Sequence, residues 1–372
     1  MLHSVLTSLI VVASSDWLID SNLVSKTAIE AGADSAGWRA QPFKPADGLT
    51  ASEFAHAFLG VAPTASMHDA PRGNTVRPLM DLPDQFDWRT ANDTFADCVG
   101  PVVRQSPIDK NGTVHHCGSC WAVSAVETLS DRRCIAMRQA GAVSAPRIEL
   151  SALDLIACDR KCEHFHKQCN MGCLGGFPLL AWEYFESTGV RSAACMPYNL
   201  TKQLLCPLIP CKAPLSDAKY TVRRHYKPFG VEQIKKDLVA GGPVQACAPR
   251  PSTYLPCVLC ALVHPSCVNS FSDGGSDRPV QATFSVYEDF MSYAGGVYRH
   301  VSGRRLGLHA VKILGYGTTT NGSEYWTAMN SWGPEFGING TFMIATGECG
   351  IDEAVLAGDP CLPGDPYPCH RV

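Results

Sequence analysis

The sequence predicts an α+β fold, in which a mainly helical half is followed by a half built from β-strands. Apolar residues recur at helical spacing in the segment 121–137, whereas short apolar runs separated by glycines dominate the chain from Thr283 onward. With 45% hydrophobic and 18% charged residues among 372, the chain is too apolar to be mostly disordered. A net charge of −4 offers no basic excess for phosphates, so nucleic-acid binding is excluded as the main function.

Helices are expected in four segments that precede Thr283. These segments are 52–59, 121–137, 179–187 and 231–240. The longest carries Val123, Val126 and Leu129 near the helical period, and the last is expected to end at the triplet Gly-Gly-Pro that follows it. Three strands are expected later in the chain, at 310–316, 325–329 and 341–345.

A short repeat interrupts this order. The tetrapeptide PVQA occurs at 243–246 and again at 279–282, and the segment between the two copies is rich in cysteine. Its cysteines are Cys247, Cys257, Cys260 and Cys267. We interpret this Cys-rich block, about 247–280, as an insertion that forms a surface loop.

Residues 1–15 are interpreted as a secretory signal peptide. The apolar run at 5–12 is too short to span a bilayer and is followed by small residues suited to cleavage, with a buried N-terminal strand as the alternative. No later segment approaches the ~18 apolar residues of a membrane helix, so no membrane association is expected. Sequons compatible with a secretory route lie at Asn92, Asn111, Asn199, Asn321 and Asn339. We expect a lysosome-like or vacuole-like compartment or the extracellular space, where most of the 18 cysteines are paired.

The motif CGSCWA at 117–122 stands at the expected start of the longest helix. A thiol reacts as its thiolate, and the positive end of a helix dipole lowers the thiol pKa, so Cys120 is the candidate nucleophile. The chemistry also needs a base and an acceptor that orients the base. His309, at the mouth of an apolar strand, and Asn330, after another strand, are the candidates, with Trp332 able to shield them from water.

These residues resemble the papain family of cysteine proteases, and within it the cathepsin B branch. The resemblance covers about 36–358 and rests on several blocks that follow the order of the family. The blocks are CGSCWA at 117–122, SDRRCI at 130–135, GCLGGFP at 172–178, FSVY at 284–287, GVY at 296–298, LGLHAV at 306–311, YWTAMNSWG at 325–333 and CGI at 349–351.

The resemblance implies a papain-like two-lobed fold, with Cys120 on a helical left lobe and His309 on a barrel-like right lobe, facing each other across a substrate groove. It implies a cysteine endopeptidase for proteins and peptides, in which Cys120 forms a thioester and His309 acts as acid and base. Gly175 and Gly176 would pair with an extended substrate, and Trp332 would line the primed side. A monomer without cofactor or bound metal is expected.

The domain boundaries follow from the same resemblance. The protease domain is expected at 82–358 and a C-terminal tail at 359–372. Residues 16–81 resemble a short propeptide, because WRA at 38–40 and FLG at 58–60 match the anchors of the family. The propeptide is expected to lie in the groove as an inhibitor until it is removed near 79–82.

The oxyanion hole of the family uses a Gln just before the nucleophile motif, and this chain has none there. The nearest is Gln105, separated from Cys117 by eleven residues where the family has two. Gln105 would reach the site if 107–116 bulges out as a loop. Otherwise His115 or His116 would replace it, or the rate would fall about 10²–10³-fold. A catalytically impaired homologue that acts as a binding protein is therefore the second hypothesis.

Two further departures concern specificity. The occluding loop of cathepsin B carries adjacent histidines, and the 196–210 stretch between Cys195 and Cys211 has none, which predicts an open groove and endopeptidase action. Where that branch often has a Glu at the floor of the S2 pocket, this chain has Ala354, which predicts a preference for Leu, Val or Phe at P2.

The family leaves Cys120 and Cys349 unpaired, so up to eight bridges are possible among the remaining cysteines. The resemblance implies Cys98–Cys134, Cys117–Cys173 and Cys195–Cys211, with two more bridges among Cys158, Cys162, Cys169 and Cys206. Apart from the resemblance, the four cysteines of the Cys-rich block are expected to pair among themselves, and Cys361 is expected to pair with Cys369 in the Pro-rich tail. The alternative is zinc, held by Cys162, His164, His166 and Cys169 or by Cys257, Cys260 and Cys267. An oxidising compartment favours the disulfides.

Overall fold

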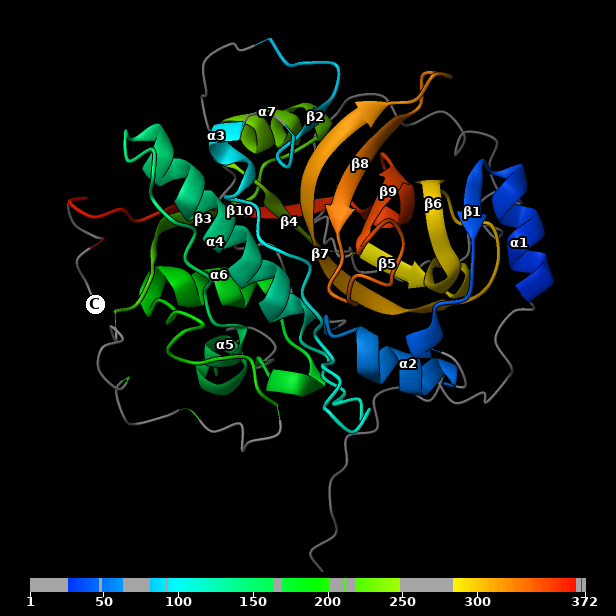
Figure 1. The fold of residues 1–372 in the computed structure, drawn as a ribbon, viewed down its shortest axis with the longest axis horizontal. Coiled ribbons are helices and arrows are strands. Elements are labelled where there is room, and N and C mark those ends of the chain that lie inside the picture. The colour runs from blue at the N-terminus through cyan, green and yellow to red at the C-terminus, as the bar shows by residue number, and fades with distance from the viewer. Residues whose placement is uncertain are drawn as a thin grey trace, which may run out of the picture.

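The computed structural model describes residues 26–46, 49–62, 81–90, 93–162, 169–200, 206, 211, 218–247, 284–365 and 369. These residues form one mainly helical lobe and one lobe built on a curved sheet, and the N-terminal segment (26–46 and 49–62) packs on the second lobe (Figure 1). The predicted α+β class and the two-lobed arrangement are confirmed. Within the described ranges, no helix is both long and apolar enough to cross a bilayer.

The helical lobe is organised around α4 (Cys120–Gln139), which is buried along most of its length. It begins one residue before the predicted 121–137 helix and ends two residues after it. Two shorter helices pack on α4, namely α5 (Ala152–Cys158) and α6 (Pro178–Ser187). α5 was not predicted because it has only 7 residues, and the side chain of its N-cap, Ser151, bonds the Asp154 N–H.

The described residues contain one ten-stranded sheet with a main path β1-β6-β9-β8-β7-β4-β10-β3, and β2 and β5 also pair with β7. The pairs are antiparallel except β6 with β9. The strands are β1 (Trp38–Ala40), β2 (Phe86–Asp87), β3 (Val222–Tyr226), β4 (Val244–Cys247), β5 (Phe284–Tyr287), β6 (Tyr293–Tyr298), β7 (Arg305–Thr318), β8 (Glu324–Met329), β9 (Thr341–Ala345) and β10 (Ala354–Pro360).

The central strand β7 is twice as long as the predicted 310–316 strand, with 14 residues. Its first residues pair with β5 and its last residues pair with β8. Nearly all of β7 is buried, which explains the continuous apolar run that predicted its middle. The strand extends beyond the apolar run at both ends, because backbone pairing with β5 and β8 continues where the side chains are polar or where the residue is glycine.

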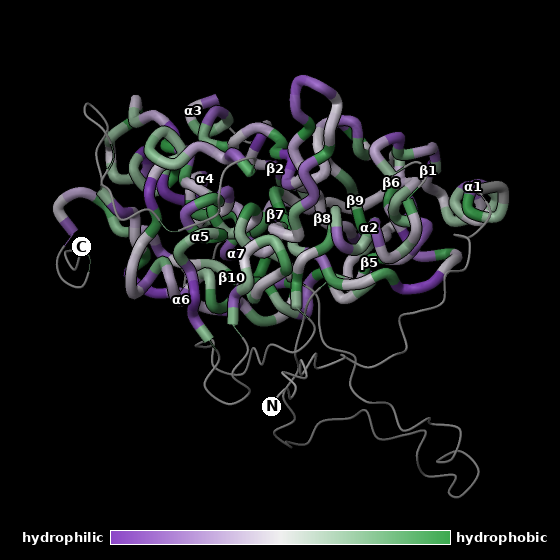
Figure 2. The backbone as a smooth tube through the Cα atoms, turned by 90° about the horizontal axis from the view of Figure 1, so that it is seen from below, coloured by the Kyte–Doolittle hydropathy of each residue, from purple (hydrophilic) through white to green (hydrophobic). Residues whose placement is uncertain are grey.

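The order of helices first and strands later holds only in part. β3 and β4 lie within the helical half of the sequence, and β10 returns from the curved sheet to pair with both of them. The remaining helices are α3 (Asp93–Ala96) and α7 (Val231–Gly241), the latter predicted at 231–240. In Figure 2 the hydrophobic stretches lie mainly in the interior and the hydrophilic ones mainly in loops at the rim.

The N-terminal segment joins the curved sheet through its own strand. β1 pairs with β6, and Trp38 stacks on Tyr293 while its indole N–H donates to the Arg299 carbonyl at 3.0 Å. The segment also contains α1 (Lys26–Ser35) and α2 (Ala51–Phe58), which replaces the predicted 52–59 helix. A capping box between Thr50 and Glu53 explains where α2 starts. α1 was missed because it buries few apolar side chains, Ile29 and Ala33.

Candidate active site

Cys120 is the first residue of α4 and is fully buried. Its thiol receives backbone N–H groups from Cys120 itself, from Trp121 and from Ala310. The first two belong to the helix N-terminus, where unpaired N–H groups favour negative charge. The Ala310 N–H belongs to β7, where Ala310 directly follows His309. The strand that carries the candidate base therefore lies against the candidate nucleophile.

His309 is buried on β7 and is held by Asn330, which follows β8. Its Nε2 lies 2.7 Å from Asn330 Oδ1, and the same oxygen accepts the Ser331 N–H at 2.8 Å. An oxygen only accepts, so His309 carries its proton on Nε2. His309 Nδ1 is buried and has no hydrogen-bond partner among the described residues. This nitrogen is therefore the one with a lone pair that can take a proton.

Trp332 covers the His309–Asn330 pair. The ring centroids of Trp332 and His309 are 4.9 Å apart, and Trp332 is fully buried. In turn, Phe54 and Phe58 of α2 pack edge-on against Trp332, and the indole N–H donates to the Phe58 carbonyl at 2.8 Å. The N-terminal segment therefore closes the site from the side that the sequence assigns to the primed subsites.

The same segment crosses the site as an extended chain. The Gly176 N–H donates to the Gly60 carbonyl at 2.9 Å and the Ala62 N–H donates to the Gly176 carbonyl at 3.1 Å, in a parallel bridge. On the other side, the Val61 N–H reaches the Leu308 carbonyl at 3.4 Å. A Cβ on Gly60 would lie 2.1 Å from the Gly118 carbonyl oxygen, so only glycine fits there.

Burial beneath this segment keeps the candidate pair uncharged. Desolvation raises the pKa of the Cys120 thiol to about 12, against smaller opposite effects of its three backbone N–H contacts. Desolvation also lowers the pKa of His309 to about 4, against the opposite effect of its hydrogen bond to Asn330. Between these values the thiol and the imidazole are both neutral in the covered site.

Gln105 reaches the site despite the long separation in sequence. Residues 107–116 form an exposed bulge closed by an Ile108–Val114 bridge. Gln105 is fully buried, with Nε2 donating to the Cys117 carbonyl at 3.0 Å and Oε1 accepting from Ser331 Oγ at 2.7 Å. His115 and His116, the predicted replacements, lie within the bulge. His115 bonds Asp109, and His116 is exposed near Glu53.

The other residues predicted to line the substrate groove are Gly175, Gly176 and Ala354. Gly175 has a φ of 116°, and a Cβ on Gly176 would lie 2.5 Å from the Trp121 ring, so both positions require glycine. Ala354 is fully buried at the start of β10, opposite Cys247 of β4.

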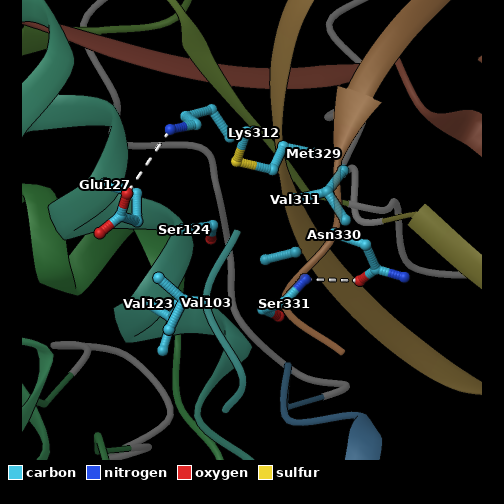
Figure 3. A pocket seen from close by; sticks show the side chains of 10 residues that line it. Val103, Val123, Ser124, Glu127, Val311, Lys312, Met329, Asn330 and Ser331 are labelled. Atoms are coloured by element: carbon cyan, nitrogen blue, oxygen red, sulfur yellow. Dashed lines mark hydrogen bonds and ion pairs between the residues drawn. The ribbon is translucent and has the colours of Figure 1, made fainter. Parts of the chain in front are cut away.

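A buried charge cluster joins α4 to β7 behind the candidate pair. Lys312 Nζ of β7 lies 3.6 Å from Glu127 Oε2 of α4 (Figure 3). It also lies 2.6 Å from Asp131 Oδ2 of α4, and Arg147 bonds both carboxylates at 2.7 Å. An adjoining cavity of about 10 Å³ is also lined by Asn330. Sequence analysis missed this cluster; the available signals were a Lys inside an apolar strand and two carboxylates spaced i, i+4 on α4.

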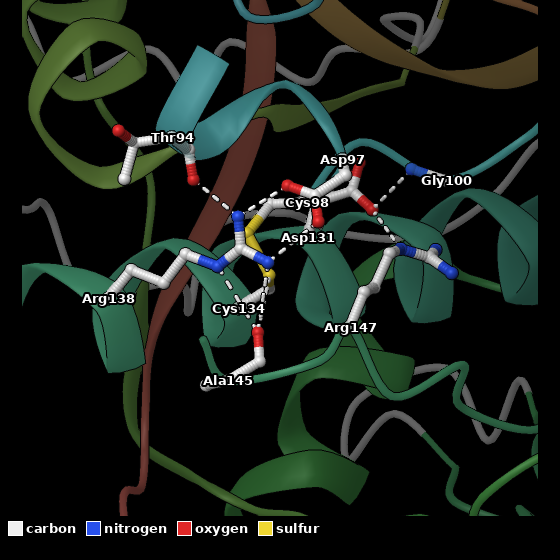
Figure 4. The surroundings of a disulfide bond; sticks show 9 residues. All are labelled: Thr94, Asp97, Cys98, Gly100, Asp131, Cys134, Arg138, Ala145 and Arg147. Atoms are coloured by element: carbon white, nitrogen blue, oxygen red, sulfur yellow. Dashed lines mark hydrogen bonds and ion pairs between the residues drawn. A yellow bond between two sulfur atoms is a disulfide. The ribbon is translucent and has the colours of Figure 1, made fainter. Parts of the chain in front are cut away.

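The disulfides in the structure include all the pairs that the resemblance implies. They are Cys98–Cys134, Cys117–Cys173, Cys158–Cys206, Cys162–Cys169, Cys195–Cys211 and Cys361–Cys369. The zinc alternative at 162–169 is wrong, because its two cysteines are bonded to each other. Around Cys98–Cys134, Arg138 bonds Asp97 and Arg147 bonds Asp131 (Figure 4).

Some predictions lie outside the described residues. These are the signal peptide, residues 79–80 of the predicted cleavage region, most of the Cys-rich block, and the sequon at Asn92. The sequon asparagines Asn111, Asn199 and Asn321 are exposed. Cys120 and Cys349 are without a disulfide partner, and they are the unpaired cysteines among those whose side chains the structure describes.

Comparisons with known proteins agree with this fold. The model of a family described as papain family cysteine protease matches residues 82–256 and 270–358. Cathepsin B-like protease 1 of Arabidopsis thaliana is 32% identical over 343 residues, covering 88% of this chain and 80% of that protein. Cathepsin B-like cysteine proteinase 4 of Caenorhabditis elegans is 34% identical over 312 residues, covering 75% and 76%. The solved structure of proCathepsin B S9 from Trypanosoma congolense has a TM-score of 0.65 and 26% identity, covering 91% of this chain and 99% of that chain.

Proposed function

Since this chain belongs to the papain family of cysteine proteases, as a cathepsin B-like member, we propose that it is an endopeptidase whose nucleophile is Cys120. One observation carries the assignment of roles. His309 gives its Nε2–H to Asn330 at 2.7 Å and keeps Nδ1 unbonded, next to the Ala310 N–H that meets the thiol. Nδ1 is thus ready to accept the thiol proton.

The proposed reaction moves one proton between the two residues. Cys120 passes its proton to His309 Nδ1, and the thiolate attacks the peptide carbonyl carbon. The resulting oxyanion accepts from the Cys120 N–H and from Gln105 Nε2, and collapses to a thioester as His309 protonates the leaving amine. Water then gives a proton to His309 and attacks the thioester carbonyl carbon. The C–S bond breaks, the acid leaves, and the sulfur takes the proton back from His309, which restores the thiol and the neutral imidazole. The location of Gln105 beside Cys117 favours this active enzyme over the impaired homologue.

Active-site labelling tests the proposal. An epoxide inhibitor added to the matured protein is expected to form one adduct, at Cys120, as mapped by peptide mass spectrometry. The matured protein should cleave a Leu-Arg fluorogenic peptide, and matured Cys120→Ser, which preserves shape but lacks the thiol, should not. A matured, correctly folded protein that leaves Cys120 unmodified and the peptide uncut would contradict the peptidase function.

We propose internal cleavage because the 196–210 segment has no adjacent histidines; most of it lies outside the described residues. A peptide with a free C-terminus should therefore give internal fragments, and dipeptides released from that end as the main product would overturn the endopeptidase assignment.

The S2 pocket is proposed to prefer apolar P2 residues because Ala354 provides no charge at its floor. Ala354→Glu is expected to raise the kcat/KM ratio of an Arg-Arg over a Leu-Arg substrate by about tenfold, the scale of one pocket contact. Glu353→Gln is the matched control, because Glu353 is exposed whereas Ala354 is buried. The same shift in both variants, or in neither, would remove Ala354 from the pocket.

The N-terminal segment is proposed to be the inhibitory part of a propeptide spanning 16–81, removed near 79–82. It pairs with Gly176 and places Gly60 against Gly118, next to Cys120, so it occupies the place where an extended substrate would pair with Gly176. We further propose that the mature monomer acts on proteins and peptides in a lysosome-like or vacuole-like compartment or outside the cell.

A further inference from the structure

We infer that Tyr198 is a positioning residue for the oxyanion hole, a role that rests on the proposed peptidase function. The Tyr198 hydroxyl connects the two groups proposed to bind the oxyanion, Gln105 and the N-terminus of α4. It lies 2.7 Å from the Gln105 carbonyl oxygen and 2.7 Å from Ser119 Oγ. These contacts join segments that are 93 and 79 residues away from Tyr198 in sequence.

The first step concerns Ser119, the N-cap of α4. A serine at this position normally accepts an N–H of the first helical turn through its side chain. Ser119 makes no such bond, and its backbone, with φ −109° and ψ 15°, is not in the extended region typical of an N-cap. Its hydroxyl points instead to Tyr198, at 2.7 Å.

The second step is the direction of the hydrogen bonds. The Gln105 carbonyl oxygen can only accept, so Tyr198 must donate its one hydroxyl proton there. The bond between the two hydroxyls therefore runs from Ser119 Oγ to Tyr198. The chain Ser119 to Tyr198 to Gln105 has a single direction, and neighbouring hydrogen bonds of this kind reinforce each other.

The third step is the state of Gln105. Each of its polar groups is bonded: the backbone N–H to the Ser331 carbonyl at 2.8 Å, the backbone carbonyl to Tyr198, Oε1 to Ser331 Oγ, and Nε2 to the Cys117 carbonyl. Nε2 carries two hydrogens and the bond to Cys117 uses one. The other hydrogen can bond an oxyanion only if the whole residue is held in place. Tyr198 contributes by bonding the backbone carbonyl of Gln105.

The segment that carries Tyr198 is held in place by a disulfide and by a hydrogen bond of its backbone. Tyr198 follows Cys195, which is bonded to Cys211, and the carbonyl of the intervening Met196 accepts from Ser151 Oγ at 2.6 Å. Burial raises the pKa of Tyr198 well above its usual value, so the hydroxyl keeps the proton that it donates. The eleven-residue separation between Gln105 and Cys117 removes the short tether that the family uses, and Tyr198 supplies a tether from a third segment.

The test is a double-mutant cycle with the matured enzyme and a fluorogenic peptide. Gln105→Ala is expected to lower kcat about 10²-fold or more, as for loss of a donor. Tyr198→Phe should lower kcat about tenfold, because it displaces the donor without deleting it, and KM should change less than twofold. In the Gln105→Ala background, Tyr198→Phe should have little further effect, since the two act as one unit.

Two measurements separate positioning from general damage. Alkylation of Cys120 by iodoacetamide needs no oxyanion hole, so its rate should be unchanged in Tyr198→Phe. Tyr226→Phe is the matched control, because that buried hydroxyl also bonds polar side chains, those of Arg132, Asp237 and Asp359, away from the site; its kcat should equal that of wild type.

The outcomes distinguish a failure of the role proposed for Tyr198 from a failure of the proposed peptidase function. Additive losses in the cycle, a slower alkylation, or full kcat in Tyr198→Phe would overturn the role of Tyr198 while wild type remains active. A wild-type protein whose Cys120 alkylates but which cleaves no peptide would instead contradict the proposed function, and with it any oxyanion to position.

Discussion

Removal of the N-terminal segment is expected to raise the rate of Cys120 alkylation at pH 6 by about 10³-fold or more. In the intact chain, burial raises the pKa of the thiol to about 12 and lowers that of His309 to about 4. At pH 6 only about one thiol in 10⁶ is then a thiolate. Once the segment leaves, water reaches the pair, desolvation is relieved, and His309 can hold the proton while the helix N-terminus stabilises the thiolate.

The pH dependence gives a second signature of the same change. Between pH 6 and 8 the intact chain should alkylate about tenfold faster per pH unit, because both values lie below the raised pKa of Cys120. The processed enzyme should be nearly independent of pH over this range. The measurement is the rate of iodoacetamide incorporation at Cys120 by mass spectrometry, with Cys120→Ser as the background. Equal rates and equal slopes in the two forms would contradict burial as the cause.

A point substitution tests whether the close approach of Gly60 to the nucleophile loop provides this cover. Gly60→Ala places a methyl group 2.1 Å from the Gly118 carbonyl oxygen, which is backbone and cannot turn aside. Alkylation of the uncleaved variant should therefore move toward that of the processed enzyme. Ser52→Ala, in an exposed position of α2, is the control and should behave like the intact chain.

Lys312→Met is expected to lower the free energy of unfolding by about 3 kcal/mol at pH 7. Lys312 is 2% exposed and bonds Asp131 at 2.6 Å, so its loss leaves buried carboxylates with fewer positive partners. The expected cost is at the lower end for a broken buried pair because Arg147 still bonds both carboxylates. Urea denaturation of the intact chain measures it. Lys236→Met is the control: Lys236 pairs with the exposed Glu232 at 2.5 Å, and the loss should stay below about 1 kcal/mol.

The penalty of Lys312→Met should shrink as the pH falls. Desolvation raises the pKa of Glu127 in the folded state, and Lys312 is the largest of the groups that oppose this shift. Without Lys312 the pKa rises further. A carboxyl group whose pKa is raised by folding favours the folded state at low pH, and this contribution is lost as the pH rises through the folded-state pKa. The variant should therefore lie closer to wild type at pH 4.5 than at pH 7, and an equal or larger gap at pH 4.5 would contradict the charge cluster as the cause.

The candidate catalytic residues could be predicted from the sequence because each lies in a short motif beside a predictable helix or strand. Cys120 precedes a helix with clear apolar periodicity, and His309 and Asn330 stand beside apolar strands, so the candidates for nucleophile, base and orienting group followed from residue type and position. The α+β class followed from the change of period along the chain. The full length of β7 did not, because strand pairing at its ends depends on β5 and β8, which are distant in sequence.

The role of Gln105 could not be decided from the sequence. The sequence offered three candidates for the second oxyanion donor and no means to choose, because the outcome depends on how 107–116 leaves the surface. The structure folds these residues into an exposed bulge and brings Gln105 to Cys117, with Tyr198 bonded behind it. A hydroxyl that bonds two groups 93 and 79 residues away has no signature in a linear pattern.

The sequence by itself determined the family resemblance, the fold class, the candidate reactive residues and four of the six disulfide pairs of the described residues, because each rests on short motifs, on periodicity, or on matches to a known pattern. The pairing among Cys158, Cys162, Cys169 and Cys206 came from the structure. Only the tertiary structure decided the ionisation state of the Cys120–His309 pair, the route of Gln105 to the site, and the Lys312 cluster that joins α4 to β7. The physical reason is that these properties arise from desolvation and from contacts between segments brought together by folding. Lys312 and Asp131, 181 residues apart, are 2.6 Å apart in the folded chain.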